Sequence, residues 1–189
     1  MISFAQEDRV LVTGASSGIG EAIALTLNSL GATVIANSRS RERLLSTREK
    51  AEDRDRFIIE ACDLSEGNES LVSWVREVAV RRGRLRGMVH SAGMMEMIPL
   101  KATDFGTARR EFDLNYFAGL ALAKGFQHRS TNVGVGASLV FVSSISALSG
   151  QMGIMNYSAT KGAINAMVRS MAVELSAKGM RVNAVVPGQ

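Results

Sequence analysis

The chain has 189 residues, of which 46% are hydrophobic and 21% are charged. This balance is typical of one folded globular domain, expected here to span residues 1–189, and it excludes a disordered or fibrous chain. The net charge is only +4, and the basic cluster at 76–86 lacks the interleaved aromatic side chains of a nucleic-acid-binding surface. We therefore expect no nucleic-acid partner.

Targeting and metal-binding signals are also missing from the sequence. The first eight residues contain no apolar run, and no stretch of about 18 uncharged apolar residues occurs, so we expect neither a secretory signal nor a membrane partner. Cys62 is the single cysteine, which favours a reducing compartment and a cytoplasmic location. With only His90 and His128 beside it, a metal site of the usual His/Cys kind is not expected.

Short apolar runs alternate with helical periodicities along the chain. Strands are expected at 9–13, 33–37, 56–62, 86–90, 137–143 and 180–185. Helices are expected from the glycines after the first strand to Gly31, at 41–50, around 71–78, at 108–127, and from Tyr157 to about 177. This alternation predicts an α/β fold with a doubly wound, Rossmann-type parallel sheet, covered by helices on both faces. In such a sheet the ligand crevice lies beyond the carboxyl ends of the strands.

Two of the expected helices carry a recognisable apolar stripe. In the first, Ile19, Ile23, Leu27 and Leu30 recur at helical spacing until Gly31 ends the helix. In the third, the expected stripe is Leu71, Trp74, Val75 and Val78.

A glycine motif, Gly14-x-x-x-Gly18-x-Gly20, joins the first strand to the first helix. Glycines let the backbone turn tightly and approach a phosphate, and the helix start offers free N–H groups and a positive dipole end. Hydroxyls from Ser16 and Ser17 add further donors. The motif therefore predicts a pyrophosphate-binding loop; the alternative is a plain turn between strand and helix.

The end of the second strand reads Asn37-Ser38-Arg39, with no acid before Glu42. An acidic side chain here would bind a ribose 2′-hydroxyl and repel a 2′-phosphate, whereas Arg39 can pair with a phosphate through two hydrogen bonds. We therefore predict NADP as the cofactor in preference to NAD. The alternative is that Arg39 is only a surface residue.

Tyr157 and Lys161 stand four residues apart in the last expected helix, so their side chains share one face. A free tyrosine has a pKa near about 10, and a fixed ammonium close by favours the phenolate and lowers that pKa. The pair can thus work as an acid/base at neutral pH, although most isolated pairs of this kind are solvated helix surface.

Together with Asn115 and Ser144, these motifs make the chain similar to the short-chain dehydrogenase/reductase family over essentially its whole length. Ser144 lies thirteen residues before Tyr157, as the family requires, whereas Ser143 does not. Among subgroups the chain most resembles the 3-oxoacyl-(acyl-carrier-protein) reductases. One departure is His90-Ser91-Ala92-Gly93, where the family usually has Asn-Asn-Ala-Gly; His90 is expected to be a hydrogen bonder at the sheet end.

The resemblance implies a role for each site residue. Tyr157 would exchange the proton at the substrate oxygen, Ser144 would hydrogen-bond that oxygen, Lys161 would hold the nicotinamide ribose, and Asn115 would support a water path to Lys161. The cofactor would be bound by Gly14, Ser16, Ser17, Gly18, Ile19, Gly20, Ser38, Arg39, Asp63, Leu64, Ser91, Ala92, Gly93, Tyr157, Lys161, Pro187 and Gly188.

The resemblance further implies an NADP-dependent oxidoreductase of a small-molecule ketone or secondary alcohol, with a 3-oxoacyl thioester as one candidate substrate, assembled as a homodimer or homotetramer through the Asn115 and Tyr157 helices. Because the sequence stops at Gln189, the family's C-terminal lid and last strand are expected to be absent. This favours one alternative, a non-catalytic dinucleotide-binding or scaffold subunit. A nucleoside-cofactor methyltransferase is a further alternative, but it leaves Tyr157 and Lys161 without a role.

The methionines Met94, Met95, Met97, Met152 and Met155 either line an adaptable apolar pocket or fill gaps in the core.

Overall fold

The computed structural model describes residues 3–65 and 67–188, and its centre is a six-stranded sheet with the strand order β3-β2-β1-β4-β5-β6. Every neighbouring pair of strands is parallel. The strands are β1 (Arg9–Thr13), β2 (Thr33–Ser38), β3 (Phe57–Ala61), β4 (Gly87–His90), β5 (Ser138–Val142) and β6 (Arg181–Val185). The order reverses between β1 and β4, and this switch point is where an open parallel sheet forms its ligand crevice.

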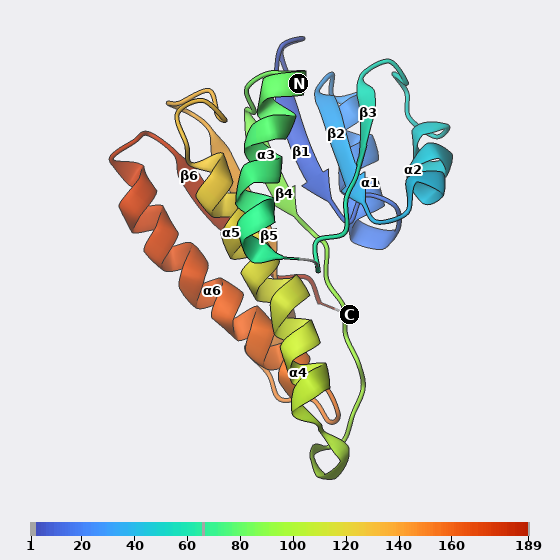
Figure 1. Cartoon of the computed structure of the whole chain (residues 1–189), viewed down its shortest axis with the longest axis vertical. Helices are drawn as coiled ribbons and strands as arrows, with labels where there is room; N and C mark the ends of the chain where they lie inside the picture. Colours follow the sequence, from blue (N-terminus) through green and yellow to red (C-terminus); the bar gives the residue numbers. More distant parts are fainter. Residues whose placement is uncertain (1–2, 66, 189) are drawn as a thin grey trace.

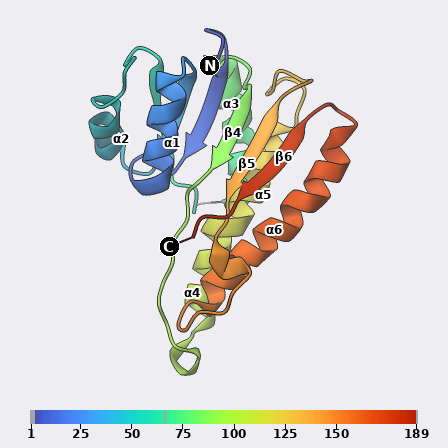
Figure 2. The same cartoon turned by 180° about the vertical axis from the view of Figure 1, so that it is seen from behind.

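Helices cover both faces of the sheet, as Figures 1 and 2 show from opposite sides. They are α1 (Gly18–Ser29), α2 (Arg41–Arg48), α3 (Asn68–Arg82), α4 (Phe105–Phe112), α5 (Ala118–Phe126) and α6 (Met155–Ser176). One face packs against α1 and α2, and the other against α3, α5 and α6. The doubly wound fold expected from the alternating pattern is therefore confirmed.

Alternate residues of the central strands supply two separate cores. On β1, Val10 and Val12 belong to the core under α1 and α2, whereas Leu11 belongs to the core under α3, α5 and α6. On β2, Ile35 likewise joins the second core, between neighbours that face the first. Because side chains alternate across a strand and both faces are covered, these strands read as continuous apolar runs in the sequence.

The buried face of α1 consists of two small residues and one asparagine. Its buried residues are Gly20, Ala24 and Asn28, whereas Ile19 is 49% exposed. The first turn of α1 lies very close to the loop that follows β1, since a Cβ on Gly20 would lie 2.3 Å from the carbonyl oxygen of Gly14. Only glycine therefore fits at this position, and Ile23 is partly buried against the core that contains Val10 and Val12.

The expected helix at 108–127 is longer at its start and is interrupted. It begins at Phe105, where the Asp104 carboxylate accepts a hydrogen bond from the Thr107 amide, and a π-helical turn at Asp113–Phe117 separates α4 from α5. A π turn inserts one residue into the helical ladder and often marks a functional position. Here the inserted turn carries Asn115, whose side chain is fully buried.

Candidate functional site

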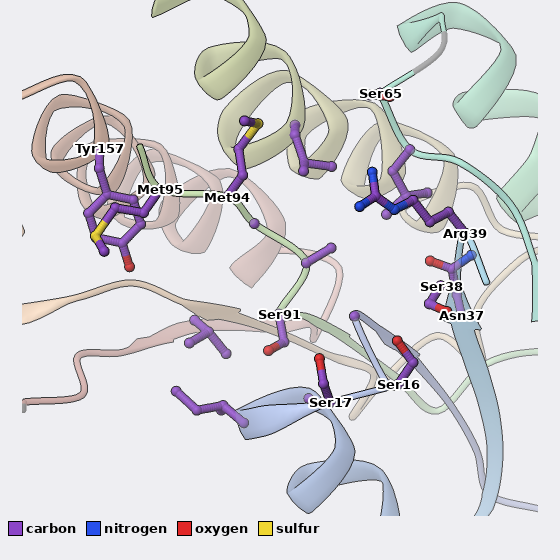
Figure 3. Close-up of a pocket in the computed structure, with 18 of the residues that line it drawn as sticks. Ser16, Ser17, Asn37, Ser38, Arg39, Ser65, Ser91, Met94, Met95 and Tyr157 are labelled. Carbon is purple, nitrogen blue, oxygen red and sulfur yellow. The ribbon is translucent and has the colours of Figure 1, made fainter. Parts of the chain in front are cut away.

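A cavity of about 820 Å³ follows the carboxyl ends of the strands. Sixteen of the seventeen residues predicted for cofactor binding line it, and so does Ser144. The sixteen are Gly14, Ser16, Ser17, Ile19, Gly20, Ser38, Arg39, Asp63, Leu64, Ser91, Ala92, Gly93, Tyr157, Lys161, Pro187 and Gly188. Gly18 and Asn115 do not line the cavity. Figure 3 shows Ser16 and Ser17 by the start of α1, Arg39 toward one side and Tyr157 toward the other.

The glycine loop is built for close backbone approach. Gly14 has a φ of 67°, and a Cβ there would lie 2.8 Å from the backbone nitrogen of Ala92. The Thr13 hydroxyl oxygen accepts hydrogen bonds from the amides of Ser91 and Ala92, both at 3.2 Å. The loops after β1 and β4 are thus joined, and α1 begins beside the cavity with its first-turn amides, a suitable cradle for a pyrophosphate.

The β2 end of the cavity carries two arginines and one carboxylate. Arg39 and Arg43 both line it, and neither forms a salt bridge within residues 3–65 and 67–188. The Asp63 carboxylate accepts hydrogen bonds from the Ser65 hydroxyl at 2.7 Å and the Ser65 amide at 2.9 Å, and these bonds lower the pKa of Asp63. The arrangement leaves two cationic groups available to an anion.

Arg43 was not identified from the sequence. It lies in the first turn of α2, where its backbone amide donates to the Ser40 hydroxyl oxygen that caps the helix. The signal was present, because a Ser N-cap directly after the strand fixes which side chains of the first turn lie near the strand end. Further lining residues that sequence reasoning did not assign are Asn37, Ser40, Cys62, Ser65, Arg110, Asp113, Leu114, Val142 and Ser143.

At the other end of the cavity, α6 presents Tyr157 and Lys161 side by side. The Lys161 ammonium lies 5.4 Å from the centroid of the Tyr157 ring and donates a hydrogen bond of 2.8 Å to the Val142 carbonyl. Lys161 is only 4% exposed, and this burial lowers its pKa from 10.5 to about 8. A single buried cation therefore stands beside a phenol in the same cavity as the glycine loop.

Ser144 follows β5 and lies in the same cavity. Its hydroxyl oxygen accepts hydrogen bonds from the amide of Ser146 at 3.2 Å and from the Ser146 hydroxyl at 2.9 Å. The neighbouring Ser143 is buried instead, and its hydroxyl donates to the Lys161 carbonyl at 3.2 Å. Of these two serines, Ser143 therefore ties β5 to α6, whereas Ser144 makes no such bond to α6 and lines the cavity that Tyr157 also lines.

Asn115 lies behind the cavity wall, where its side chain holds the segment after β4. Its amide oxygen accepts from the Met94 amide at 2.8 Å, and its amide nitrogen donates to the Met94 carbonyl at 2.9 Å and to the Thr160 hydroxyl oxygen at 3.0 Å. A Cβ on Gly93 would lie 3.1 Å from the Asn115 side-chain oxygen and 3.6 Å from the Lys161 ammonium. Asn115 and Lys161 therefore approach the same glycine.

His90 is a buried hydrogen bonder at the end of β4, as expected. It is 1% exposed, its Nδ1 lies 3.0 Å from the Thr13 hydroxyl oxygen, and it does not line the cavity. Burial and the charge of Lys161 lower its pKa from 6.5 to about 4. His90 is thus neutral at physiological pH.

Four of the five methionines considered as pocket or core residues are exposed at the surface. Met95, Met97, Met152 and Met155 are 52%, 72%, 91% and 47% exposed, so the interpretation of these four as core residues is wrong. Met94 and Met95 line the same cavity as Tyr157, and Figure 3 labels all three. Two methionine side chains therefore contribute to the wall of the cavity that contains the phenol.

Residues 3–65 and 67–188 lack the features of two other site classes. They contain no group of three or more His, Cys, Asp or Glu side chains arranged to hold a metal ion. No helix within them is long and apolar enough to cross a membrane.

Comparison with known proteins identifies a family over nearly the whole chain. The model for short chain dehydrogenases matches residues 8–189. The 3-oxoacyl-[acyl-carrier-protein] reductase FabG of Rickettsia conorii is 32% identical over 186 residues, which cover 94% of this chain and 70% of that protein. The NADPH-dependent aldehyde reductase 1, chloroplastic, of Arabidopsis thaliana is 32% identical, covering 94% of this chain and 64% of the relative. A short chain dehydrogenase from Shigella flexneri 2a, solved in complex with NADP, superposes with a TM-score of 0.86 at 28% identity, covering 100% of this chain and 80% of that one.

Proposed function

The chain belongs to the short-chain dehydrogenase/reductase family and is an oxidoreductase acting on CH–OH or C=O groups with a nicotinamide cofactor; on that premise we propose that it is an NADP-dependent reductase of ketones, with 3-oxoacyl thioesters as the favoured substrates. The observation that carries the proposal is the buried Lys161 ammonium 5.4 Å from the Tyr157 ring, in the cavity that also contains the glycine loop.

The cavity fits a dinucleotide in size and chemistry. Its volume of about 820 Å³ extends from the glycine loop to Tyr157, and a side chain on Gly14 or Gly20 would collide with the loop backbone. Ser16, Ser17 and the first-turn amides of α1 would hold the pyrophosphate, and Ser91 to Gly93 would pass beside the adenosine ribose. When bound, the nicotinamide supplies the hydride to the carbonyl carbon.

The protein's own groups would handle the proton. As the carbonyl oxygen gains negative charge, Tyr157 delivers its phenolic proton to that oxygen, and the Ser144 hydroxyl donates a hydrogen bond to it. Lys161 holds a positive charge beside the phenol below a pH of about 8, which stabilises the phenolate left after proton transfer. Asn115 holds the Met94 segment and supports a water path from Lys161 to solvent.

The preference for NADP rests on Arg39 and Arg43. Both line the β2 end of the cavity, where an acidic side chain would select the ribose 2′-hydroxyl of NAD, and Arg39 can pair with a 2′-phosphate through two hydrogen bonds. The names of two similar proteins, one NADPH-dependent and one solved with NADP, support the same preference.

The substrate class is supported by the relatives named 3-oxoacyl-[acyl-carrier-protein] reductases and by Met94 and Met95, which line the same cavity as Tyr157. Unbranched, polarisable methionine side chains adapt to an apolar chain. We further propose a homodimer or homotetramer in the cytoplasm, joined through the Asn115 and Tyr157 helices. Exposed apolar side chains on these elements, Phe117 at 41% and Leu120 at 38%, support the assembly.

Two parallel activity assays test the proposal. Purified protein is incubated with 3-oxoacyl thioesters and simple ketones, and oxidation of NADPH and of NADH is followed by absorbance. We expect turnover with NADPH to exceed that with NADH. Complete inactivity over the panel, with NADPH still bound, would instead support a non-catalytic dinucleotide-binding subunit.

Arg39→Asp then tests the cofactor assignment. Loss of a charged hydrogen-bonding partner costs about 10- to 100-fold, so the ratio of NADPH to NADH efficiency should fall by about that factor. The matched control is Arg41→Asp, because Arg41 is exposed on α2 and does not line the cavity. An unchanged ratio in Arg39→Asp would refute the NADP assignment.

A further inference from the structure

Ser146 is a buried serine that no part of the proposed reaction uses. It is the middle residue of a short 3-10 turn, Ile145–Ala147, which follows β5. Its exposed fraction is 6%, and it does not line the cavity. Its amide and its hydroxyl both approach one atom, the Ser144 hydroxyl oxygen, at 3.2 and 2.9 Å.

These two contacts occupy the acceptor capacity of Ser144. A serine hydroxyl oxygen has two acceptor positions and one proton to donate. The Ser146 amide can only donate, and the Ser146 hydroxyl donates to the remaining acceptor position. Ser144 can then form a further hydrogen bond only by donating its own proton, and a carbonyl oxygen in the cavity can accept that hydrogen bond. A hydroxyl that accepts hydrogen bonds also becomes a better donor, because hydrogen bonds in a chain polarise one another.

We infer that Ser146 is a positioning residue that commits the Ser144 hydroxyl to donating its proton into the cavity. The inference rests on the proposed function, in which Ser144 hydrogen-bonds the substrate oxygen. It adds a residue that touches neither substrate nor cofactor and acts only through Ser144.

The surrounding backbone does not depend on the Ser146 hydroxyl. The Ser143 amide donates to the Val185 carbonyl at 2.8 Å, and the Ile145 amide donates to the Pro187 carbonyl at 2.9 Å. These bonds hold the segment against β6 on both sides of Ser144. Removing the Ser146 hydroxyl should therefore alter the direction of the Ser144 proton and leave the loop in place.

A double-mutant cycle separates this role from a structural one. The variants are Ser146→Ala, Ser144→Ala and the double variant, and each is assayed for kcat, for substrate KM and for NADPH binding by fluorescence. Loss of one hydrogen bond that orients a donor should lower kcat by about 3- to 10-fold with NADPH affinity unchanged. In the Ser144→Ala background, Ser146→Ala should cost nothing further, because the hydroxyl through which it acts is gone.

Two further variants control for packing and for the loop. Ser146→Cys preserves most of the volume but donates only weakly, so it should lose turnover as Ser146→Ala does; recovery in the cysteine variant would assign the loss to a cavity and overturn the inference. Ser149→Ala removes an exposed hydroxyl that bonds the Ile145 carbonyl in the same loop, and it should retain full turnover.

The opposite hydrogen-bond direction gives an opposite result. If Ser144 donated to Ser146, Ser146→Ala would release the Ser144 proton, and turnover would stay the same or rise. Unchanged or higher turnover in Ser146→Ala overturns the inference, and so does an equal loss of kcat in the wild-type and Ser144→Ala backgrounds. In either case, turnover by the wild type still upholds the proposed function. A wild type inactive on the whole panel overturns both.

Discussion

The buried imidazole of His90 makes stability depend on pH in a calculable way. The Thr13 hydroxyl oxygen accepts from two amides, so its own proton goes to His90 Nδ1, which must act as an acceptor. Charging the ring would remove that acceptor and leave a cation in the core. Accordingly the pKa is about 4 in the native state, against 6.5 for an ordinary histidine.

The sign follows from proton binding. Between pH 6.5 and 4 the unfolded chain holds a proton on this ring that the native state does not, so acidification through this window favours unfolding. From pH 7 to pH 5, a shift of this size lowers the free energy of unfolding by about 2 kcal/mol.

Urea unfolding of the wild type and of His90→Asn at both pH values measures this contribution. Asparagine keeps an acceptor for Thr13 and does not titrate, so the variant should lose about 2 kcal/mol less than the wild type between pH 7 and 5. His128→Asn is the matched control, because His128 is exposed and its ring bonds only Ser130 within the described chain. Equal pH dependence in the wild type and His90→Asn would refute a buried neutral His90.

Three further predictions test other parts of the structure. Gly125→Ala should lower the free energy of unfolding in urea by about 1–3 kcal/mol, since its Cβ would lie 2.1 Å from Val75 Cγ1. Gly162→Ala, in open space on α6, should instead raise it by about 0.5–1 kcal/mol. Similar changes for both variants would contradict the packing of α3 on α5. Arg43→Ala should weaken NADPH binding about 10-fold and leave NADH binding unchanged, measured by fluorescence titration, and equal losses for both would contradict a phosphate contact. Because burial lowers the Lys161 pKa to about 8, kcat/KM for reduction should fall as the pH rises through 8, and a flat profile to higher pH would exclude this role.

Sequence patterns predicted the fold and most of the cavity because each signal there is local. Strand and helix periodicities specify the order of elements, and parallel strands bring their carboxyl ends to one edge. The glycine motif and the four-residue spacing of Tyr157 and Lys161 depend only on neighbouring residues. The structure accordingly places the glycine loop, Tyr157, Lys161 and Ser144 in one cavity.

Features that depend on three-dimensional packing were not predictable in this way. At Gly20 an added Cβ would lie 2.3 Å from the carbonyl oxygen of Gly14, so a glycine faces inward there, whereas Ile19, which belongs to the apolar periodicity, is 49% exposed. The π turn around Asn115 could not be predicted, because a single such turn leaves no hydrophobic periodicity in the sequence. The 91% exposure of Met152 likewise depends on where its loop lies in the fold, which the composition of the sequence does not specify.

The most direct test of the account is turnover by Tyr157→Phe. The change removes the phenolic oxygen and keeps the ring beside Lys161, so NADPH should bind with unchanged affinity. Loss of the proton donor should lower kcat by about 10²-fold or more, with the same ketone or thioester that the wild type reduces. A variant that retains wild-type kcat would contradict the assignment of Tyr157 as the proton donor and with it the proposed mechanism.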